Sequence, residues 1–150
     1  MEKRGRGDPG EAGPVTVRFW KSGGRFEEVA SYSRAKRIGP FVWVAGTTAI
    51  EPTGRIHAPG NVGAQTLYIL SRIEDALKEV GAELRHVGRV RAYLTDLSQA
   101  GAFAQAHGEF FKGIDPALTA VQAGLTQPGL MVEIDVDAVI HGENGEISGF

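Results

Sequence analysis

Three carboxylates near the end of the chain alternate with apolar residues in the segment MVEIDVDAVI (131–140). In an extended strand, this period of two places Glu133, Asp135 and Asp137 on one face, with neighbouring carboxylates about 7 Å apart. Such a row is typical of a general acid–base site, of a cation site or of a solvated strand face. For Asp135 and Asp137 the solvated face is the simpler interpretation.

Glu133 has a different context because it ends a long uncharged segment. No charged side chain lies between Asp115 and Glu133, although 23% of the chain is charged. A carboxyl group beside such an apolar lining is expected to have a raised pKa, which suits it to proton transfer. We therefore expect Glu133 to be the catalytic residue of any site in this chain.

The histidines do not suggest a metal centre. His107 shares an apolar helical stripe with Phe103 and Phe110, where packing in a core or an interface is a simpler role than that of a base. No pair has the i, i+4 spacing of metal ligands on a helix, and the other three are scattered over loops and chain ends: His57, His86 and His141. We expect neither a metal nor another cofactor.

Nucleophile and nucleic-acid motifs are also missing from the sequence. The chain has no Gly-x-Ser-x-Gly motif, no cysteine and no glycine-rich phosphate loop. The formal net charge of −2 gives no electrostatic footprint for nucleic acid. A basic cluster of Arg34, Lys36 and Arg37 fits phosphate binding or a solvated strand about equally well, and only Tyr32 lies beside it as a stacking platform. We therefore do not expect nucleic acid as a partner.

Composition predicts one globular domain outside the membrane. A chain of 150 residues, 42% hydrophobic, suffices for one substantial core. The first residues lack the apolar core of a signal peptide, and no run of about 18 apolar residues occurs. Together with the absence of cysteine, these features lead us to expect a cytoplasmic location without a membrane partner.

The pattern of residues predicts a single domain over 15–140, with a flexible N-terminal tail (1–14) and a C-terminal tail (141–150). Strands are expected at 15–20, 28–38, 40–50, 87–97, 117–123 and 131–140. An amphipathic helix is expected from 62 to 80, capped by Asn61 and stopped by Gly81, and a second over 99–112, capped by Ser98. This order predicts an α+β fold with two helices packed on one face of a mixed sheet. Because the strand containing Trp43 is apolar on both faces, we expect the other face to form a subunit interface.

Several stretches together resemble the Rid family, also called the YjgF or L-PSP endoribonuclease-like family. They are YSRAKRIGPFVWVAGTTA, the helix AQTLYILSRIEDALKEVGAEL, VGRVRAYLTDL, HGEFF and PALTAV followed by LMVEIDVDAV. The resemblance covers residues 28–140. It implies a chorismate-mutase-like fold, a homotrimer, and clefts between subunits that bind small molecules.

The resemblance also implies a set of site residues. The glutamate that is thought to position water falls on Glu133, and the tyrosine of the cleft falls on Tyr32. The serine–glycine pair of the family corresponds to Ala45 and Gly46, its helix asparagine to Ala104 and its nearby tyrosine to His107. The arginine that binds the substrate carboxylate falls on Leu118, followed on the same strand face by Ala120.

RidA-type members hydrolyse enamines and imines such as 2-aminoacrylate. Leucine donates no hydrogen bond, so a substrate carboxylate buried beside Leu118 would lack its partner unless Arg34 or Arg91 reached the cleft. The chain therefore resembles a subgroup without the arginine. We expect it to bind a small carbonyl, enamine or imine compound, and to be a hydrolase or deaminase if it is an enzyme. The alternatives are a ribonuclease or translation inhibitor and a non-catalytic, chaperone-like binding protein.

Overall fold

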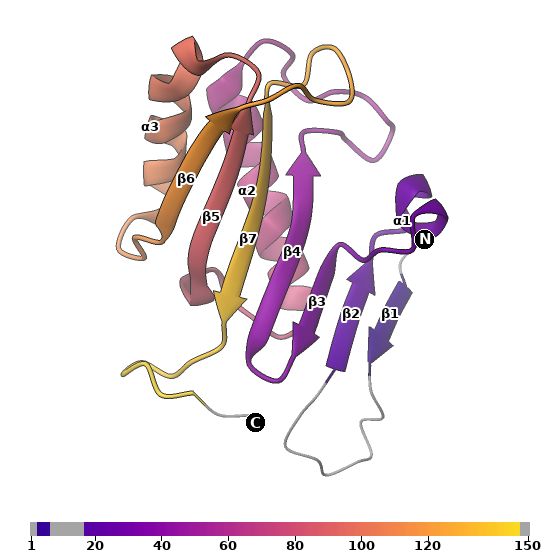
Figure 1. The fold of residues 1–150 in the computed structure, drawn as a ribbon, viewed down its shortest axis with the longest axis vertical. Helices are drawn as coiled ribbons and strands as arrows, with labels where there is room; N and C mark the ends of the chain where they lie inside the picture. The colour runs from indigo at the N-terminus through magenta and orange to yellow at the C-terminus, as the bar shows by residue number, and fades with distance from the viewer. Residues whose placement is uncertain (1–2, 7–16, 148–150) are drawn as a thin grey trace.

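A computed structural model of the chain describes residues 3–6 and 17–147, which form one sheet with helices behind it (Figure 1). The strands are β1 (Lys3–Arg6), β2 (Val17–Lys21), β3 (Ala35–Ile38), β4 (Phe41–Thr48), β5 (Val87–Leu94), β6 (Ala117–Gln122) and β7 (Val132–Val139). The helices are α1 (Arg25–Val29), α2 (Val62–Glu79) and α3 (Ala100–Phe111), with short 3₁₀ turns η1 (Leu84–His86) and η2 (Leu97–Gln99). The strand order is β1-β2-β3-β4-β7-β5-β6, and only the β5–β6 pair is parallel. The predicted α+β class is confirmed.

The long helix α2 forms where its sequence predicts it. Asn61 accepts a hydrogen bond from the amide of Ala64 and so caps the first turn, while Gly81 adopts a φ of 85° just after the helix ends. The buried stripe consists of residues at three- and four-residue spacing, which are at most 3% exposed: Ile69, Leu70, Ile73, Ala76 and Leu77. Leu67 lies three residues before Leu70 but is 37% exposed, because it lies on the outward side of the helix.

The core lies between the sheet and helices α2 and α3. Alternate residues of β5 and β7 point into it, including Val90, Leu94 and Ile134, which are all 0% exposed. Burying such a side chain contributes about 1.5–3 kcal/mol. The intervening residues face the other side of the sheet, which we call the open face (Figure 1). Glu133, Asp135 and Asp137 share the open face, as their alternation predicts.

Three expectations about secondary structure were wrong in part. Residues 28–34 do not continue a strand, since α1 and a turn with Ser31 at a φ of 58° precede β3. The strand expected over 87–97 stops at Leu94, and Ser98 does not cap α3 but lies in η2, where its amide donates to Asp96.

The N-terminal tail expected over 1–14 is also not uniform. Residues 3–6 form β1, which pairs antiparallel with β2. This pairing satisfies backbone groups that would otherwise line an unpaired sheet edge. The rest of that predicted tail lies outside the described residues.

The open face combines an apolar end with a charged centre. Four large apolar side chains there are 37–44% exposed: Val17, Ile38, Phe41 and Trp43. Beside them, Arg91 Nε donates to Asp135 at 2.8 Å and Arg91 Nη2 contacts Asp137 at 3.3 Å, while the Tyr93 hydroxyl donates to Asp135 at 3.0 Å. The apolar end remains our predicted subunit interface. Among the described residues, no helix is long and apolar enough to cross a membrane.

Candidate functional site

The Glu133 side chain lies directly over Gly46 of β4, where a larger residue would collide with it. The pairing of β4 with β7 shifts register between Val44 and Thr47, and Gly46 lies within this irregularity. A Cβ atom added to Gly46 would lie 2.4 Å from Glu133 Oε2, far inside normal contact. Glycine at this position therefore allows the Glu133 carboxyl group to pass directly over the β4 backbone.

The environment of Glu133 suits proton transfer. Its side chain is half-buried, and this burial raises the pKa of the Glu133 carboxyl above the ordinary value of 4.5. The positive charge of Arg34 opposes this rise, whereas the negative charge of Asp135 adds to the raised pKa. A carboxyl group held in this way can donate or accept a proton closer to neutral pH than a solvated glutamate.

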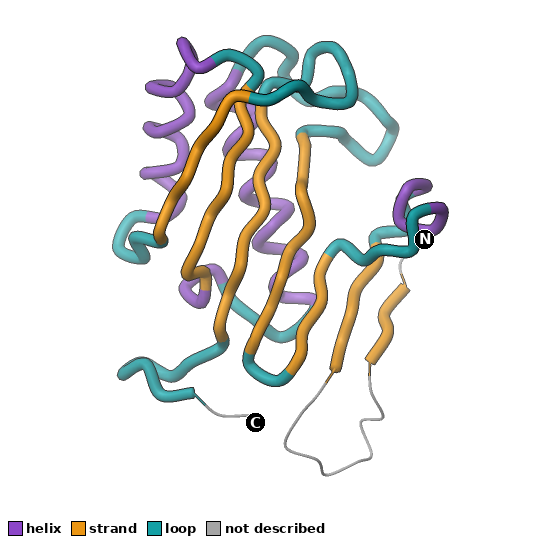
Figure 2. The backbone as a smooth tube through the Cα atoms, viewed as in Figure 1, coloured by secondary structure: helices purple, strands orange, loops and turns teal. Residues whose placement is uncertain are grey.

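Glu133 lines a cleft of about 990 Å³ at the end of the sheet where β4 ends and β7 begins. The walls come from three segments: the turn and helix over 22–27, the loop over 50–54, and residues 126–127. Figure 2 shows these loops around the same end of the sheet. Tyr32, Gly46 and Glu133 all line this cleft.

Arg34 lines this cleft, and its positive charge acts on the Glu133 carboxyl group. Its Nη1 donates to the Gly46 carbonyl at 2.9 Å, and its Nε lies 3.6 Å from Glu27 Oε2. Its guanidinium carbon lies 5.4 Å from the ring centroid of Tyr32, within cation–π range. Glu27 is itself buried and accepts hydrogen bonds from the amide and hydroxyl of Ser22. These contacts hold Arg34 beside Glu133.

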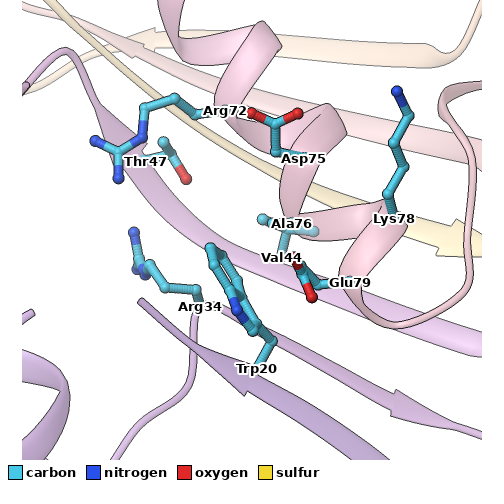
Figure 3. A pocket seen from close by; sticks show the side chains of 9 residues that line it. All are labelled: Trp20, Arg34, Val44, Thr47, Arg72, Asp75, Ala76, Lys78 and Glu79. Atoms are coloured by element: carbon cyan, nitrogen blue, oxygen red, sulfur yellow. The ribbon is translucent and has the colours of Figure 1, made fainter. Parts of the chain in front are cut away.

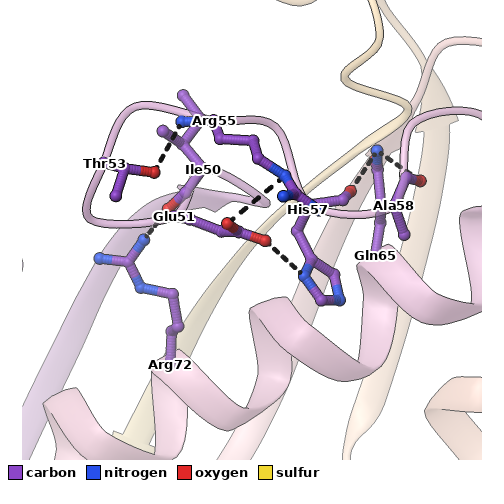
Figure 4. Close-up of polar contacts among 8 residues, drawn as sticks. All are labelled: Ile50, Glu51, Thr53, Arg55, His57, Ala58, Gln65 and Arg72. Carbon is purple, nitrogen blue, oxygen red and sulfur yellow. Dashed lines mark hydrogen bonds and ion pairs between the residues drawn. The ribbon is translucent and has the colours of Figure 1, made fainter.

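The loop over 49–61 is anchored by helix α2 (Figure 4). The fully buried Gln65 donates to the carbonyls of His57 and Gly129 at 3.1 and 2.9 Å, and accepts from the amide of Met131 at 2.9 Å. Arg72 Nη1 donates to the carbonyl of Ile50 at 2.5 Å. Both side chains thus fix loop segments that border the cleft.

His57 fastens the same loop to the outer surface of α2. Its Nδ1 lies 3.0 Å from Glu51 Oε2, and its ring stacks on Tyr68 with the centroids 4.3 Å apart. Glu51 lines the cleft, so this pair sets the position of one wall.

A smaller cavity of about 420 Å³ lies between α2 and strands β2–β4 (Figure 3). Trp20, Val44 and Ala76 give it an apolar wall, and Asp75, Lys78 and Glu79 lie along α2. Three residues line both this cavity and the cleft: Arg34, Thr47 and Arg72. Figure 3 shows the two guanidinium groups and Thr47 at the same end of this cavity.

The predicted site residues separate into two groups. Tyr32, Gly46 and Glu133 lie together in the cleft, and Ala45 is adjacent in β4, where its amide donates to the carbonyl of Arg34. The others lie elsewhere in the chain: His107, Leu118 and Ala120.

Residues of this second group belong to the helix side of the sheet. Leu118 and Ala120 lie in β6 in register with Val90 and Ala92, whose side chains point into the core. His107 is 8% exposed on α3, between the rings of Phe103 and Phe111, and burial lowers the pKa of its imidazole. In a single chain, therefore, these residues do not reach the Glu133 cleft.

Sequence reasoning missed Glu27 and Arg72 as residues of the site. Arg72 follows a helical pattern typical of a solvated face, and nothing in its neighbours marks it out. The sequence did single out Arg34, first as part of a basic cluster and then as a substitute cation. Of the two candidate cations, Arg34 lines the cleft, whereas Arg91 is paired with Asp135 and Asp137.

Comparison with known proteins shows the family of the chain. The family model described as endoribonuclease L-PSP matches residues 23–140. A RutC family protein of Pyrococcus abyssi is 32% identical over 111 residues, which is 73% of this chain and 87% of the relative.

Solved structures show the same fold. A YjgF/YER057c/UK114 family member of Mycobacterium tuberculosis is 42% identical, with a TM-score of 0.73 over 80% of this chain and 96% of the other. A protein of unknown function from Pseudomonas aeruginosa is 29% identical, with a TM-score of 0.64 over 79% and 84% of the two chains. The chain belongs to the endoribonuclease L-PSP family, also known as the YjgF or Rid family.

Proposed function

We propose that the chain binds a small metabolite of the carbonyl, enamine or imine type in the cleft that holds Glu133. The observation that carries the proposal is the half-buried Glu133 carboxyl group, placed over Gly46 in a cleft that Tyr32 also lines. Its raised pKa suits it to move protons in such chemistry. Protonation of an enamine at carbon gives an iminium ion; water added at the iminium carbon then leads to loss of ammonia, which leaves a ketone and returns the proton. Glu133 would position that water.

We propose further that the working site lies between subunits of a homotrimer. Glu133 and Tyr32 line a cleft of one subunit, and the edge strand β6, with Leu118 and Ala120, would belong to the neighbouring subunit. Two features support this arrangement. All six residues of β6 are exposed, and the open face of the sheet carries the exposed side chains of Phe41 and Trp43.

This arrangement disfavours the RidA-type reaction on 2-aminoacrylate. Leu118 would bring an apolar side chain to the position from which relatives bind the substrate carboxylate. Removing one charge-assisted pair from a buried site costs about 1.5–3 kcal/mol, which corresponds to about 10- to 100-fold in affinity. If no other cation of the cleft binds that carboxylate, the wild-type chain should hydrolyse 2-aminoacrylate no faster than buffer does.

Two measurements test the proposal. Purified protein is incubated with enzymatically generated 2-aminoacrylate, and the release of ketoacid and ammonia is compared for wild type, Leu118→Arg and Leu118→Met. A gain with arginine but not with methionine would support an intact cleft with Glu133 in place, and Glu133→Gln in the arginine background should abolish the gain.

Binding is tested separately by calorimetry with methyl 2-oxobutanoate, an uncharged ketone, for wild type and Glu133→Gln. Binding by the wild type that is weakened in the variant supports the proposal. If the ketone does not bind the wild type and Leu118→Arg gains no activity, the proposed function is wrong.

A further inference from the structure

Besides Glu133, the most informative feature is the junction between the cleft and the smaller cavity. Arg34 from the segment before β3 and Arg72 from α2 both line the cleft and the smaller cavity. Their guanidinium groups lie at the same end of the smaller cavity as Thr47 (Figure 3). Two basic side chains from distant parts of the sequence thus converge on one point behind the cleft.

Each guanidinium group keeps donors for a ligand. Arg34 uses Nη1 for the Gly46 carbonyl and Arg72 uses Nη1 for the Ile50 carbonyl, while Arg34 Nε forms an ion pair with Glu27 at 3.6 Å but no hydrogen bond. Within residues 3–6 and 17–147, no contact occupies the Nη2 group of either residue. A guanidinium group has five N–H donors, so both residues can still donate to a planar anion.

The charges around the junction favour an anion at this point. Glu27 is satisfied by Ser22 and Arg34, and Glu51 is paired with His57 and Arg55. Arg72 forms no ion pair in the described part of the chain; its other contact is the ring of Tyr68, whose centroid lies 6.0 Å away. Among the described residues, the positive charge of Arg72 therefore has no ion-pair partner.

The two cavities do not favour the anion equally. The smaller cavity carries Asp75 and Glu79 along α2, away from the two guanidinium groups, so a negative charge deep inside it would be repelled (Figure 3). Thr47 donates its hydroxyl hydrogen to the Ala45 carbonyl at 2.9 Å and has none left for an anion. The favourable position is the junction itself, where Arg34 and Arg72 border the cleft.

We propose that the Arg34–Arg72 junction binds the carboxylate of the ligand, in place of the arginine that β6 lacks. This inference rests on the proposed function, and it names the ligand class: a carboxylate whose carbonyl or imine carbon reaches Glu133 while its carboxylate contacts α2 and the segment before β3. The ligand is then held within one subunit at its charged end, and Leu118 of β6 contacts only its apolar part.

The test compares two probes that differ in one charge. Binding of 2-oxobutanoate and of methyl 2-oxobutanoate is measured by titration calorimetry for wild type, Arg72→Gln and Arg72→Lys. Lys112→Gln serves as a control, because Lys112 is an exposed residue that lines neither cavity. The circular dichroism spectrum and unfolding midpoint of each variant show that it is folded.

We expect 2-oxobutanoate to bind the wild type at least 10-fold more tightly than the ester does. Arg72→Gln should weaken the oxoacid about 10-fold or more and leave the ester unchanged, while Arg72→Lys should fall between wild type and Arg72→Gln because it keeps the charge but not the paired donors. Lys112→Gln should match the wild type.

Two outcomes would overturn this inference while the proposed function stands. In the first, the wild type binds the two probes with equal affinity. In the second, Arg72→Gln weakens the binding of neither probe, or weakens the binding of both to the same extent. Failure of both probes to bind the wild type would contradict the proposed function as well.

Discussion

The contact between Gly46 and Glu133 gives the sharpest quantitative prediction. In Gly46→Ala, the new Cβ would lie 2.4 Å from Glu133 Oε2, whereas ordinary contacts begin at 3.4 Å, so the carboxyl group must move by about 1.0 Å. The φ of Gly46 lies outside the left-handed region, so alanine itself fits the backbone. The conflict is therefore between the new methyl group and the far end of the Glu133 side chain.

The expected energies follow from these two terms. Forcing Glu133 off its rotamer costs about 0.5–1.5 kcal/mol, whereas replacing glycine by alanine at a compatible site stabilises by about 0.4–1 kcal/mol through the unfolded chain. In the wild-type background the terms nearly cancel, so Gly46→Ala should change the free energy of unfolding by less than about 1 kcal/mol. In a Glu133→Ala background the clash is gone, and the same substitution should stabilise. The coupling energy between the two sites is thus about 0.5–1.5 kcal/mol.

Urea unfolding at fixed protein concentration measures this cycle, since an oligomer's stability depends on concentration. Gly88→Ala is the control, because a Cβ at Gly88 meets no atom within 4 Å and should show no coupling to Glu133. The activity expected of Leu118→Arg should fall far more than stability does when Gly46→Ala is added, since a displacement of about 1 Å at a reacting centre can cost about 100-fold in rate. An identical effect of Gly46→Ala in both backgrounds would refute the placement of Glu133 over Gly46.

Three further predictions follow from buried polar groups. Burial raises the pKa of Glu133 in the folded state, so the folded state stays protonated to a higher pH than the unfolded chain does. The free energy of unfolding should therefore fall as pH rises through the window just above 4.5. Urea unfolding at several pH values should show this fall for the wild type but not for Glu133→Gln. His107 has a lowered pKa, so stability should fall as pH drops below 6.5, and a His107→Phe variant with an unchanged pH profile would contradict this. Gln65→Leu should lower the free energy of unfolding by about 3 kcal/mol, because it leaves loop carbonyls and the Met131 amide unpaired. Gln105→Leu, on the exposed side of α3, should change this free energy little. If hydrogen exchange at the Met131 amide is no faster in Gln65→Leu than in the wild type, Gln65 does not anchor the loop.

The elements predicted correctly are those whose pattern is local. Helix α2 combines a three- and four-residue apolar spacing with Asn61 at one end and Gly81 at the other. Strand β7 alternates over its whole length, and β5 alternates from Val90 to Leu94. The segment before β3 was misread because its β-branched and aromatic residues resemble a strand. Its true shape depends on Glu27, which folds back to Ser22 and Arg34 through contacts that no local pattern reveals.

The site residues that a local pattern or the family resemblance marks were predicted, and those brought in only by the fold were not. Glu133 stands out because it ends an uncharged segment, and the family resemblance adds Tyr32 and Gly46; all three line one cleft. The role of Arg72 could not be predicted, because a single arginine on a helix looks like a solvated residue. Only the packing of α2 against β4 brings its guanidinium group to the same junction as Arg34.

The two groups of predicted residues constrain how the cleft can be completed. Glu133 lies on the open face, while Leu118 and Ala120 share register with core residues on the helix side, and β5 lies between them in the same sheet. Leu118 and Ala120 lie two strands away from Glu133 and on the other face, so no rotation of their side chains brings them into its cleft. A cleft that contains both must therefore combine the Glu133 end of one chain with the β6 edge of another. Within that geometry, the carboxylate contacts that we propose for Arg34 and Arg72 come from the same chain as Glu133. The neighbouring chain would then determine the shape of the apolar wall, and substitutions at Leu118 should change which ligands fit more than they change the binding of the charge.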